Sequence, residues 1–412
     1  MNNLKRLISY ILVASVTSLM LSSCSLFKKG EPLYPTSYNP GSVSKKTGMF
    51  YSGGDENSFE VKDYAGMPEG PNLVYIEGGR MILGSFEEDI LNSRDNLERT
   101  VTVASFWMDE TEVTNLDWLE YLHNAQDSGA QYLEEALPDT TVWAKELAYN
   151  DPYVQHYLRY PGFRFFPVVG VDWTQAKKYC LWRTTMVNRQ LAIDNGDDEE
   201  AATAEAGGRI PLESGIVLPN YRLPSEAEWQ YAAEALIGTQ DIDENQSNRR
   251  LYPWDGHSLR NPYGEEMGNF LANFKRGRGD YAGIAGALND NAMITAWVYS
   301  NPPNDYGLFN MAGNVNEWVE DIYRPLTYQD FDDLNPLRSS GFLDDADWDY
   351  VYDKAGYNTF IDNHVRVYKG GSWKDVAYWL SPGTRRYLEE DSATATIGFR
   401  CAMIDAGDFS AY

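Results

Sequence analysis

Three cysteines and four histidines are the side chains of this 412-residue chain best suited to redox or metal chemistry. The cysteines, Cys24, Cys180 and Cys401, form no Cys-x-x-Cys pair, which excludes thioredoxin-like redox sites and zinc ribbons. No two histidines stand at i, i+3 or i+4, so they predict no metal cluster. The chain also lacks a Gly-x-Ser-x-Gly nucleophile elbow and a Gly-x-Gly-x-x-Gly phosphate loop. The histidines are His123, His156, His257 and His364.

The first of these cysteines lies in a segment that resembles an export signal. Lys5 and Arg6 precede an apolar run at 7–21, and Leu21-Ser22-Ser23-Cys24 resembles the lipobox of bacterial lipoproteins, which are cut before the cysteine and lipidated on it. We therefore expect residues 1–23 to be a signal peptide and Cys24 to carry lipid. The resemblance implies an outer-membrane, lipid-anchored protein that faces the periplasm. The alternative is an uncleaved anchor with an incidental cysteine.

Lipidation of Cys24 leaves Cys180 and Cys401 as an even pair in an oxidising compartment. A disulfide between them would close a loop of roughly 220 residues and stabilise the fold by about 5 kcal/mol in the chain-entropy model. Two separate buried thiols are the alternative that the spacing leaves open.

The charge balance excludes whole classes of partner. The chain has 34 basic and 61 acidic residues, a net charge of -27, which repels nucleic-acid phosphates and anionic membrane surfaces. It favours cations, including divalent metals, and basic proteins. Apolar residues make up 43% and aromatic residues 14% of the chain, and this composition is typical of a folded protein rather than a disordered one.

The pattern of apolar residues predicts mixed helices and strands. Residues 24–70 show neither helical nor strand periodicity and are predicted to be a tether. Strands are expected at 73–76 and 81–83, on either side of a turn at Gly78-Gly79. Thr114 and Ser225 are typical N-cap residues of amphipathic helices, and Ser225 forms a capping box with Glu228. Cys180 lies on the apolar face of a third helix, so it is expected in the core.

Three stretches depart from this pattern. Acidic segments at 184–220 and 325–362 are predicted to be surface insertions. Residues 250–320 are rich in Gly, Asn and Pro with little period, so we expect something other than helix and sheet to hold them in order. A closing strand pair is expected around 365–373 and 397–401, and 406–412 is a tail.

Seven ordered segments together resemble the formylglycine-generating-enzyme (sulfatase-modifying factor) domain. The resemblance covers roughly residues 70–405 and implies one large α+β domain at 71–405, with a C-type-lectin-like fold and much irregular structure. The segments are 76–84, 108–115, 169–173, 222–229, 306–318, Gly370-Gly371-Ser372-Trp373 and Gly398-Phe399-Arg400-Cys401.

The resemblance also bears on catalysis. The family's oxidase uses two cysteines, after its Gly-Gly-Ser-aromatic segment, to bind copper and activate oxygen, and the matching positions here are Asp375 and Leu380. A carboxylate and an isobutyl group cannot replace two thiolates as soft metal ligands and redox partners. The chain is therefore predicted to be a pseudoenzyme without catalytic residues. The iron-dependent, sulfoxide-forming branch of the family needs a histidine cluster, which is absent here.

The family's structural sites imply two calcium ions and one disulfide. The family disulfide joins the positions of Cys180 and Cys401. Hard oxygen donors in an irregular loop suit Ca²⁺, which would also order residues 250–320. The alternative at the first site is that the side chains of Asn310 and Glu317 only satisfy backbone amides of a turn. The first site matches Asn310, Gly313, Val315 and Glu317, and the second matches Asn273, Phe274, Asp290 and Ala292.

Within this family, the lipobox, the stretches at 252–256 and 272–280 and the two insertions resemble gliding-motility lipoproteins of the GldJ and GldK kind, which belong to the type IX secretion apparatus. This resemblance implies a non-catalytic scaffold whose partners are secretion and gliding proteins of the outer membrane and periplasm. The acidic, aromatic insertions are the expected contact surfaces. Two alternatives remain: a calcium-dependent glycan-binding module and a residual formylglycine-type oxidase.

Overall fold

The structure, a computed structural model, divides the chain into two compact units. Unit 1 comprises 1–67, 211–216 and 408–412, and unit 2 comprises 68–210 and 217–407. The described residues are 35–52, 59–61, 64, 66–85, 96–145, 148–195, 212–237, 250–281, 283–284, 287–288, 292–324, 332–338 and 363–407.

In unit 1, the described residues form local turns and one short 3-10 helix. Thr36 bridges to Asn39 and Val43 to Phe50, both in antiparallel fashion. The 3-10 helix is η4 (Leu212–Ser214).

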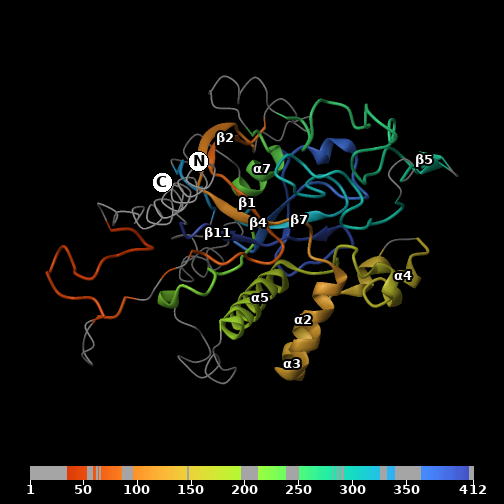
Figure 1. The fold of residues 1–412 in the computed structure, drawn as a ribbon. Coiled ribbons are helices and arrows are strands. Elements are labelled where there is room, and N and C mark those ends of the chain that lie inside the picture. The colour runs from red at the N-terminus through yellow and green to blue at the C-terminus, as the bar shows by residue number, and fades with distance from the viewer. Residues whose placement is uncertain are drawn as a thin grey trace, which may run out of the picture. The chain divides into compact units, whose positions relative to one another are not determined.

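Unit 2 holds the α-helices and strands of the described chain (Figure 1). Among the described residues, no helix is both long and apolar enough to cross a membrane. The helices are α2 (Asn115–Asp127), α3 (Ala130–Ala136), α4 (Asp151–His156), α5 (Trp173–Asp194) and α7 (Glu226–Glu234), with 3-10 helices η1 (Thr140–Trp143), η2 (Pro161–Phe163) and η6 (Ala377–Leu380). The strands are β1 (Leu73–Ile76), β2 (Gly79–Leu83), β3 (Arg99–Val103), β4 (Phe106–Asp109), β5 (Gly283–Ile284), β6 (Ala287–Leu288), β7 (Asn316–Ile322), β8 (Val365–Lys369), β9 (Arg386–Glu389), β10 (Ile397–Gly398) and β11 (Ala402–Ile404).

The strands form four small sheets. A three-stranded antiparallel sheet has the order β1-β4-β11, and a four-stranded sheet has the order β10-β7-β8-β9, in which β10 pairs with β7 in parallel. The pairs β2-β3 and β5-β6 complete the set. The strands predicted at 73–76 and 81–83 are both confirmed, although β1 and β2 belong to different sheets.

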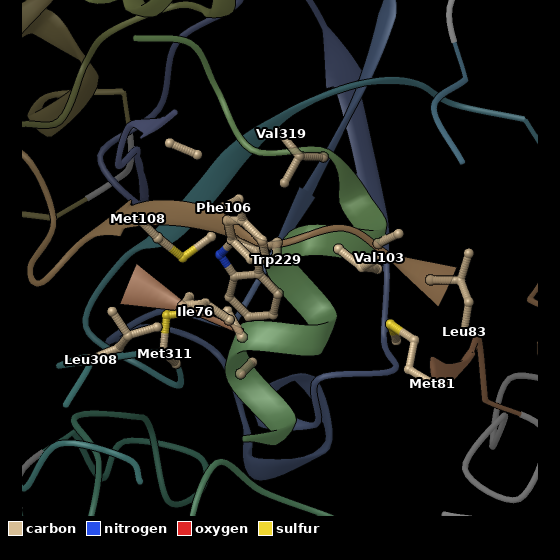
Figure 2. Close-up of a cluster of buried hydrophobic side chains, with 14 of the residues drawn as sticks. Ile76, Met81, Leu83, Val103, Phe106, Met108, Trp229, Leu308, Met311 and Val319 are labelled. Atoms are coloured by element: carbon tan, nitrogen blue, oxygen red, sulfur yellow. The ribbon is translucent and has the colours of Figure 1, made fainter. Parts of the chain in front are cut away.

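The main core lies between α7 and the strands. The indole ring of Trp229 on α7 is fully buried at the centre of this cluster, among Ile76, Phe106 and Met108 (Figure 2). Because partners directly opposite in the register share a face, Val74, Met108 and Ala402 all point towards this core. The next pair along the ladder, Leu73 and Asp109, points the other way, towards α5.

Side-chain caps begin the helices that the sequence predicted. Thr114 and Asp117 form a capping box on α2, and Ser225 and Glu228 form another on α7. Both predicted N-caps are confirmed. Asp172 caps α5, whose residue Cys180 is buried in the core as expected.

Buried asparagine side chains hold much of the irregular stretch before β7. Asn304 donates to the carbonyl of Ala232 (2.7 Å) and accepts from the amides of Tyr306 and Leu308 (3.1 Å each). Asn314, whose φ is 62°, accepts from the amide of Ala296 (2.7 Å). Local side-chain bonds therefore supply part of the order that the sequence analysis assigned to an ion.

The predicted insertion at 184–220 is wrong in its boundaries. Helix α5 continues to Asp194, because Thr184 and Ala192 repeat the buried face of Cys180 at helical spacing. Asn188 on this helix exchanges two hydrogen bonds with the backbone of Leu218 (2.8 and 3.0 Å). Residues 196–211 lie outside the described residues.

The second predicted insertion contributes an ordered segment. Within 325–362 the structure describes 332–338, where Leu334 forms a parallel bridge to Thr102 of β3. The expected closing strand pair is also corrected, because β8 and β10 share a sheet but β7 lies between them. Central β7 is buried at every residue except the half-buried Glu320, and it pairs with β10 on one edge and with β8 on the other.

Candidate functional site

Asp375 follows the end of β8, in the segment where the sequence analysis placed a catalytic thiol. Gly370 (φ 97°) and Gly371 (φ 72°) turn the chain here, and a Cβ on Gly371 would lie 2.9 Å from both the Leu380 side chain and the Trp379 carbonyl oxygen. The turn therefore requires glycine and fixes where Asp375 lies.

The carboxylate of Asp375 is fully engaged. Both Oδ atoms accept from the two Nη atoms of Arg386 on β9 (2.7 Å each). Oδ2 also accepts from the Ser372 hydroxyl (2.5 Å) and from Asn316 Nδ2 on β7 (3.2 Å). Burial, which raises the pKa of Asp375, is outweighed by these bonds and by the Arg386 charge, so its pKa lies below the usual range. Asp375 is thus an ionised structural partner of Arg386.

Leu380, at the position of the second thiol, is a core residue. It ends η6 and is fully buried against a cluster that includes Phe270, Ala272 and Phe274. An apolar side chain in such packing has no chemistry to offer a substrate.

A cleft of about 370 Å³ opens beside Asp375. Trp143 and Trp373 form its aromatic wall, with stacked rings 5.9 Å apart at 20°. Burial lowers the pKa of Lys374, another lining residue. The described lining contains neither cysteine nor histidine, so the cleft can hold a ligand but offers no thiol to oxidise one.

A second cluster surrounds Glu317 and Arg400, both fully buried. Arg400 donates to the two oxygens of Glu317 through Nε and Nη2 (2.7 Å each), and Trp229 Nε1 donates to Oε2 (2.7 Å). Its remaining donors reach the carbonyls of Asp109, Glu110 and Phe309. All five N–H groups of Arg400 therefore have acceptors.

Glu112 is the second buried carboxylate of this cluster. It accepts from Asn310 Nδ2 (3.0 Å) and Asn314 Nδ2 (2.9 Å). Burial, together with the charge of Glu317, raises the pKa of Glu112 to about 7 despite the nearby Arg400. The charge of Arg400 thus acts on two buried carboxyl groups, Glu317 and Glu112.

Comparison with known proteins decides the family. The model of the sulfatase-modifying factor enzyme 1-like domain matches residues 59–404, which is most of the chain. The chain belongs to this family. Its α+β, formylglycine-generating-enzyme-like fold is therefore established, as one large domain with much irregular structure.

Relatives of this sulfatase-modifying-factor domain differ in activity. The formylglycine-generating enzyme of Mus musculus is 26% identical over 82% of this chain and 78% of its own length. The inactive C-alpha-formylglycine-generating enzyme 2 of the same species is 26% identical over 82% and 87%. The family thus includes a protein named as inactive, and a non-catalytic member is compatible with it.

Two further matches extend the comparison. The serine/threonine-protein kinase pkn1 of Chlamydia pneumoniae is 27% identical over 80% of this chain, which spans only 37% of that kinase. The solved structure of PvdO from Pseudomonas aeruginosa is 19% identical, covers 81% of this chain and 94% of its own, and has a TM-score of 0.47.

At the first calcium site that the family resemblance implied, the side chains do not fit an ion. Glu317 already accepts three hydrogen bonds and is neutralised by Arg400. Asn310 Oδ1 accepts from Asn301 Nδ2 (2.9 Å), and its Nδ2 donates to Glu112 and to the carbonyl of Val298. Gly313 and Val315 could offer only backbone carbonyls. The hydrogen bonds of Asn310 and Glu317 therefore do not support an ion at this site. The alternative prediction is not supported either, because the partners of both residues are side chains and distant backbone carbonyls rather than amides of a turn.

The second calcium site has one donor that fits. Asn273 is 1% exposed, and its Oδ1 is buried without a hydrogen-bond partner among the described residues. Its Nδ2 donates to the carbonyl of Ile294 (2.7 Å), which fixes the amide orientation. Phe274 and Ala292 are buried too, and Asp290 lies outside the described residues. An orphaned carbonyl oxygen of this kind is suited to a hard cation.

The two remaining cysteines lie together across 221 residues of chain. Their Sγ atoms are 3.2 Å apart and both side chains are buried, and burial raises the pKa of the Cys401 thiol well above its usual value. The fold thus brings the predicted pair into contact, while the covalent bond stays a prediction. Cys24, the predicted lipidation site, lies outside the described residues.

We expect the protein isolated from an oxidising compartment to carry a Cys180–Cys401 disulfide. Reduction should then lower the free energy of unfolding by about 3–5 kcal/mol, because the unfolded chain regains the freedom of a long loop. Peptide mass spectrometry without reductant, followed by urea unfolding with and without reductant, measures both. The Cys180→Ala variant is the control, since reductant should not change its stability. Two free thiols in the native protein would contradict the prediction.

Sequence reasoning missed most partners in these clusters. Arg400 lies within the Gly398-Phe399-Arg400-Cys401 motif and Glu112 within the motif at 108–115, but the motifs alone predicted no role for either residue. A charged residue amid buried apolar neighbours was the available signal, since such charges are paired in folded proteins. Arg386 and Asn316 carried no comparable signal.

Proposed function

We propose that this chain is a non-catalytic family member that acts as a structural component of the type IX secretion and gliding-motility machinery. The observation that carries the proposal is that neither of the two positions expected to hold catalytic thiols has a thiol or a free reactive group. Asp375 is bound by Arg386, Ser372 and Asn316, and Leu380 is packed in the core. Soft metal ligation and thiol oxidation both require groups that these positions lack.

The proposed location rests on the N-terminal sequence. The lipobox at Leu21-Ser22-Ser23-Cys24 and the following tether at 24–70 support a lipid anchor in the outer membrane, with the folded domain facing the periplasm. A scaffold of this kind needs a rigid body and an exposed surface rather than a reactive group. The proposed partners are secretion and gliding proteins of the outer membrane and periplasm.

A crosslinked pull-down tests this assignment. The full lipidated chain is recovered in mild detergent from its own outer membrane, and its partners and crosslinked peptides are identified by mass spectrometry. Recovery of secretion-system membrane and periplasmic proteins would support the scaffold proposal. Recovery of the chain alone, or with glycan only, would contradict it and favour a lectin-like module.

We also propose one structural calcium ion, at the site of Asn273. Calcium in 100-fold excess over its dissociation constant should add about 3 kcal/mol to the free energy of unfolding, because only the folded state assembles the ligands. Calorimetry in calcium and in chelator measures this difference. It should vanish in Asn273→Ala and persist in Asn188→Ala, a control that also loses side-chain bonds to backbone. Equal stability of the native protein in calcium and in chelator would contradict the proposal.

A further inference from the structure

A continuous groove runs along α5, opposite α2 and the segment that enters β1. Its wider part encloses about 1060 Å³ and its narrower part about 400 Å³. The two parts share five lining residues, so they form one surface: Pro71, Asn72, Glu120, Met186 and Val187. None of the groove's residues lines the cleft beside Asp375. Figure 1 shows α2 and α5 on the same side of the β1-β4-β11 sheet, away from α7.

The helices present regular stripes to this groove. On α5, Trp182, Met186, Gln190 and Asp194 recur every four residues, and Asp117 and Glu120 of α2 are three apart. With a rise of 1.5 Å per residue, the stripe from 182 to 194 is about 18 Å long. That length accommodates about five residues of extended polypeptide.

The charge of the groove is strongly one-sided. Its lining has six carboxylates and two guanidinium groups, Arg183 and Arg189. Arg183 is closed off by a bidentate pair with Asp109 (2.6 and 2.8 Å). The other five carboxylates take part in none of the salt bridges within the described chain: Glu69, Glu110, Asp117, Glu120 and Asp194.

Exposed apolar groups line the same groove. Phe165 is 51% exposed and Ile193 37% exposed, although both line the groove. Tyr299 is another lining residue, and its ring lies 5.5 Å from that of Trp297, which is 50% exposed. Exposed aromatic rings beside carboxylates attract a cationic side chain by charge and by cation–π contact, and its aliphatic stem by packing.

We propose that this groove binds a basic, extended segment of a partner protein, with Lys or Arg side chains reaching the carboxylates and apolar side chains on Met186, Val187 and Phe165. Charge complementarity argues for this occupant over a second copy of the chain, whose net charge is -27. The inference deepens the proposed scaffold function, on which it rests, by naming the chemistry of the partner. It places a contact surface on helix α5, whose last residues belong to the predicted contact segment 184–220.

Fluorescence anisotropy with the full chain in detergent tests the proposal. The probe is a fluorescein-labelled octapeptide of alternating lysine and leucine. The triple variant Glu69→Gln, Glu110→Gln, Glu120→Gln should weaken its binding about tenfold, because three solvent-accessible charge contacts of roughly 0.5 kcal/mol each are lost. Asp117 is left intact because it closes the capping box of α2.

The matched control removes the same charge elsewhere. Glu265, Glu266 and Glu389 are exposed and do not line the groove, so their triple change to Gln should alter binding less than twofold. Equal weakening in both triple variants would overturn the proposal, because binding would then follow net charge alone. Failure of the peptide to bind the native protein would also overturn it.

Hydrogen exchange gives a second readout. The bound peptide should protect amides of 183–194 and 69–74, and protection at the Asp375 cleft instead would contradict the groove assignment. The binding experiment and the pull-down test different proposals, so one can fail without the other. Peptide binding without recovery of secretion proteins would keep the groove and remove the machinery assignment, and recovery without peptide binding would do the reverse.

Discussion

Replacing Arg400 with methionine is expected to destabilise the protein by about 3–5 kcal/mol, measured by urea unfolding. The change leaves Glu317 buried without its counter-charge, beside a second buried carboxyl at Glu112. Three backbone carbonyls also lose the hydrogen bond that Arg400 donates to them. A buried charge without a partner is costly because neither water nor protein solvates it.

Two further variants make this prediction specific. In Arg400→Met with Glu317→Gln the unpaired charge is gone, so we expect roughly 2 kcal/mol to be recovered. Arg222→Met, which breaks a bidentate pair with Glu228 at the edge of the core, should cost only about 1 kcal/mol. Rescue of Arg400→Met by calcium would contradict our interpretation, because Glu317 would then be a metal ligand.

Replacing Glu226 with glutamine is the second change with a large expected effect, again about 3–5 kcal/mol. Glu226 is buried between two cations, Lys369 Nζ (3.3 Å) and Arg385 Nη2 (2.8 Å), whose side chains are at most 1% exposed. Both would lose the carboxylate of Glu226. Glu135→Gln, which breaks an exposed pair with Lys178, is the control and should have only a minor effect.

The same cluster makes stability depend on pH through Asp321. Burial, and then the charge of Glu226, raise the pKa of Asp321 from 3.8 to about 7. Between pH 4 and 7 the folded protein keeps a proton that the unfolded chain has lost. The contribution of Asp321 to the free energy of unfolding therefore falls as pH rises through this window, by at most about 4 kcal/mol.

Unfolding of native and variant protein across this pH range checks the sign. In Glu226→Gln the charge that helps raise the pKa of Asp321 is absent, so this decline should become shallower. Asp321→Asn should remove this contribution and leave that of Glu112, whose pKa is also raised to about 7, mainly by burial. An equal pH dependence in native protein and Asp321→Asn would show that Asp321 does not titrate in this window.

Local chemistry explains which parts of the fold the sequence could predict. Thr114 and Ser225 each form an N-cap with a residue three positions on, so a short segment contains the whole interaction. The strands at 73–76 and 81–83 and the buried face of Cys180 follow from local periodicity.

The site could be predicted only in part, because its contacts join distant segments. Asp375 and Leu380 were identified through the family resemblance, but the sequence cannot show that Arg386 and Asn316 enclose the carboxylate. The end of α5 was placed too early, because the composition becomes polar near residue 184 while the helical spacing of buried residues continues to Ala192. The pairing of Glu317 with Arg400, 83 residues away, likewise could not be predicted, and it engages a side chain that the family resemblance assigned to the first calcium site.

The absence of thiol chemistry is the central claim, and an oxidation assay tests it most directly. The purified full chain is supplied with copper, oxygen and a cysteinyl peptide, and the peptide is then examined by mass spectrometry for conversion of cysteine to formylglycine. With an ion pair at Asp375 and a packed side chain at Leu380, our account predicts unchanged peptide. Formation of formylglycine would contradict it.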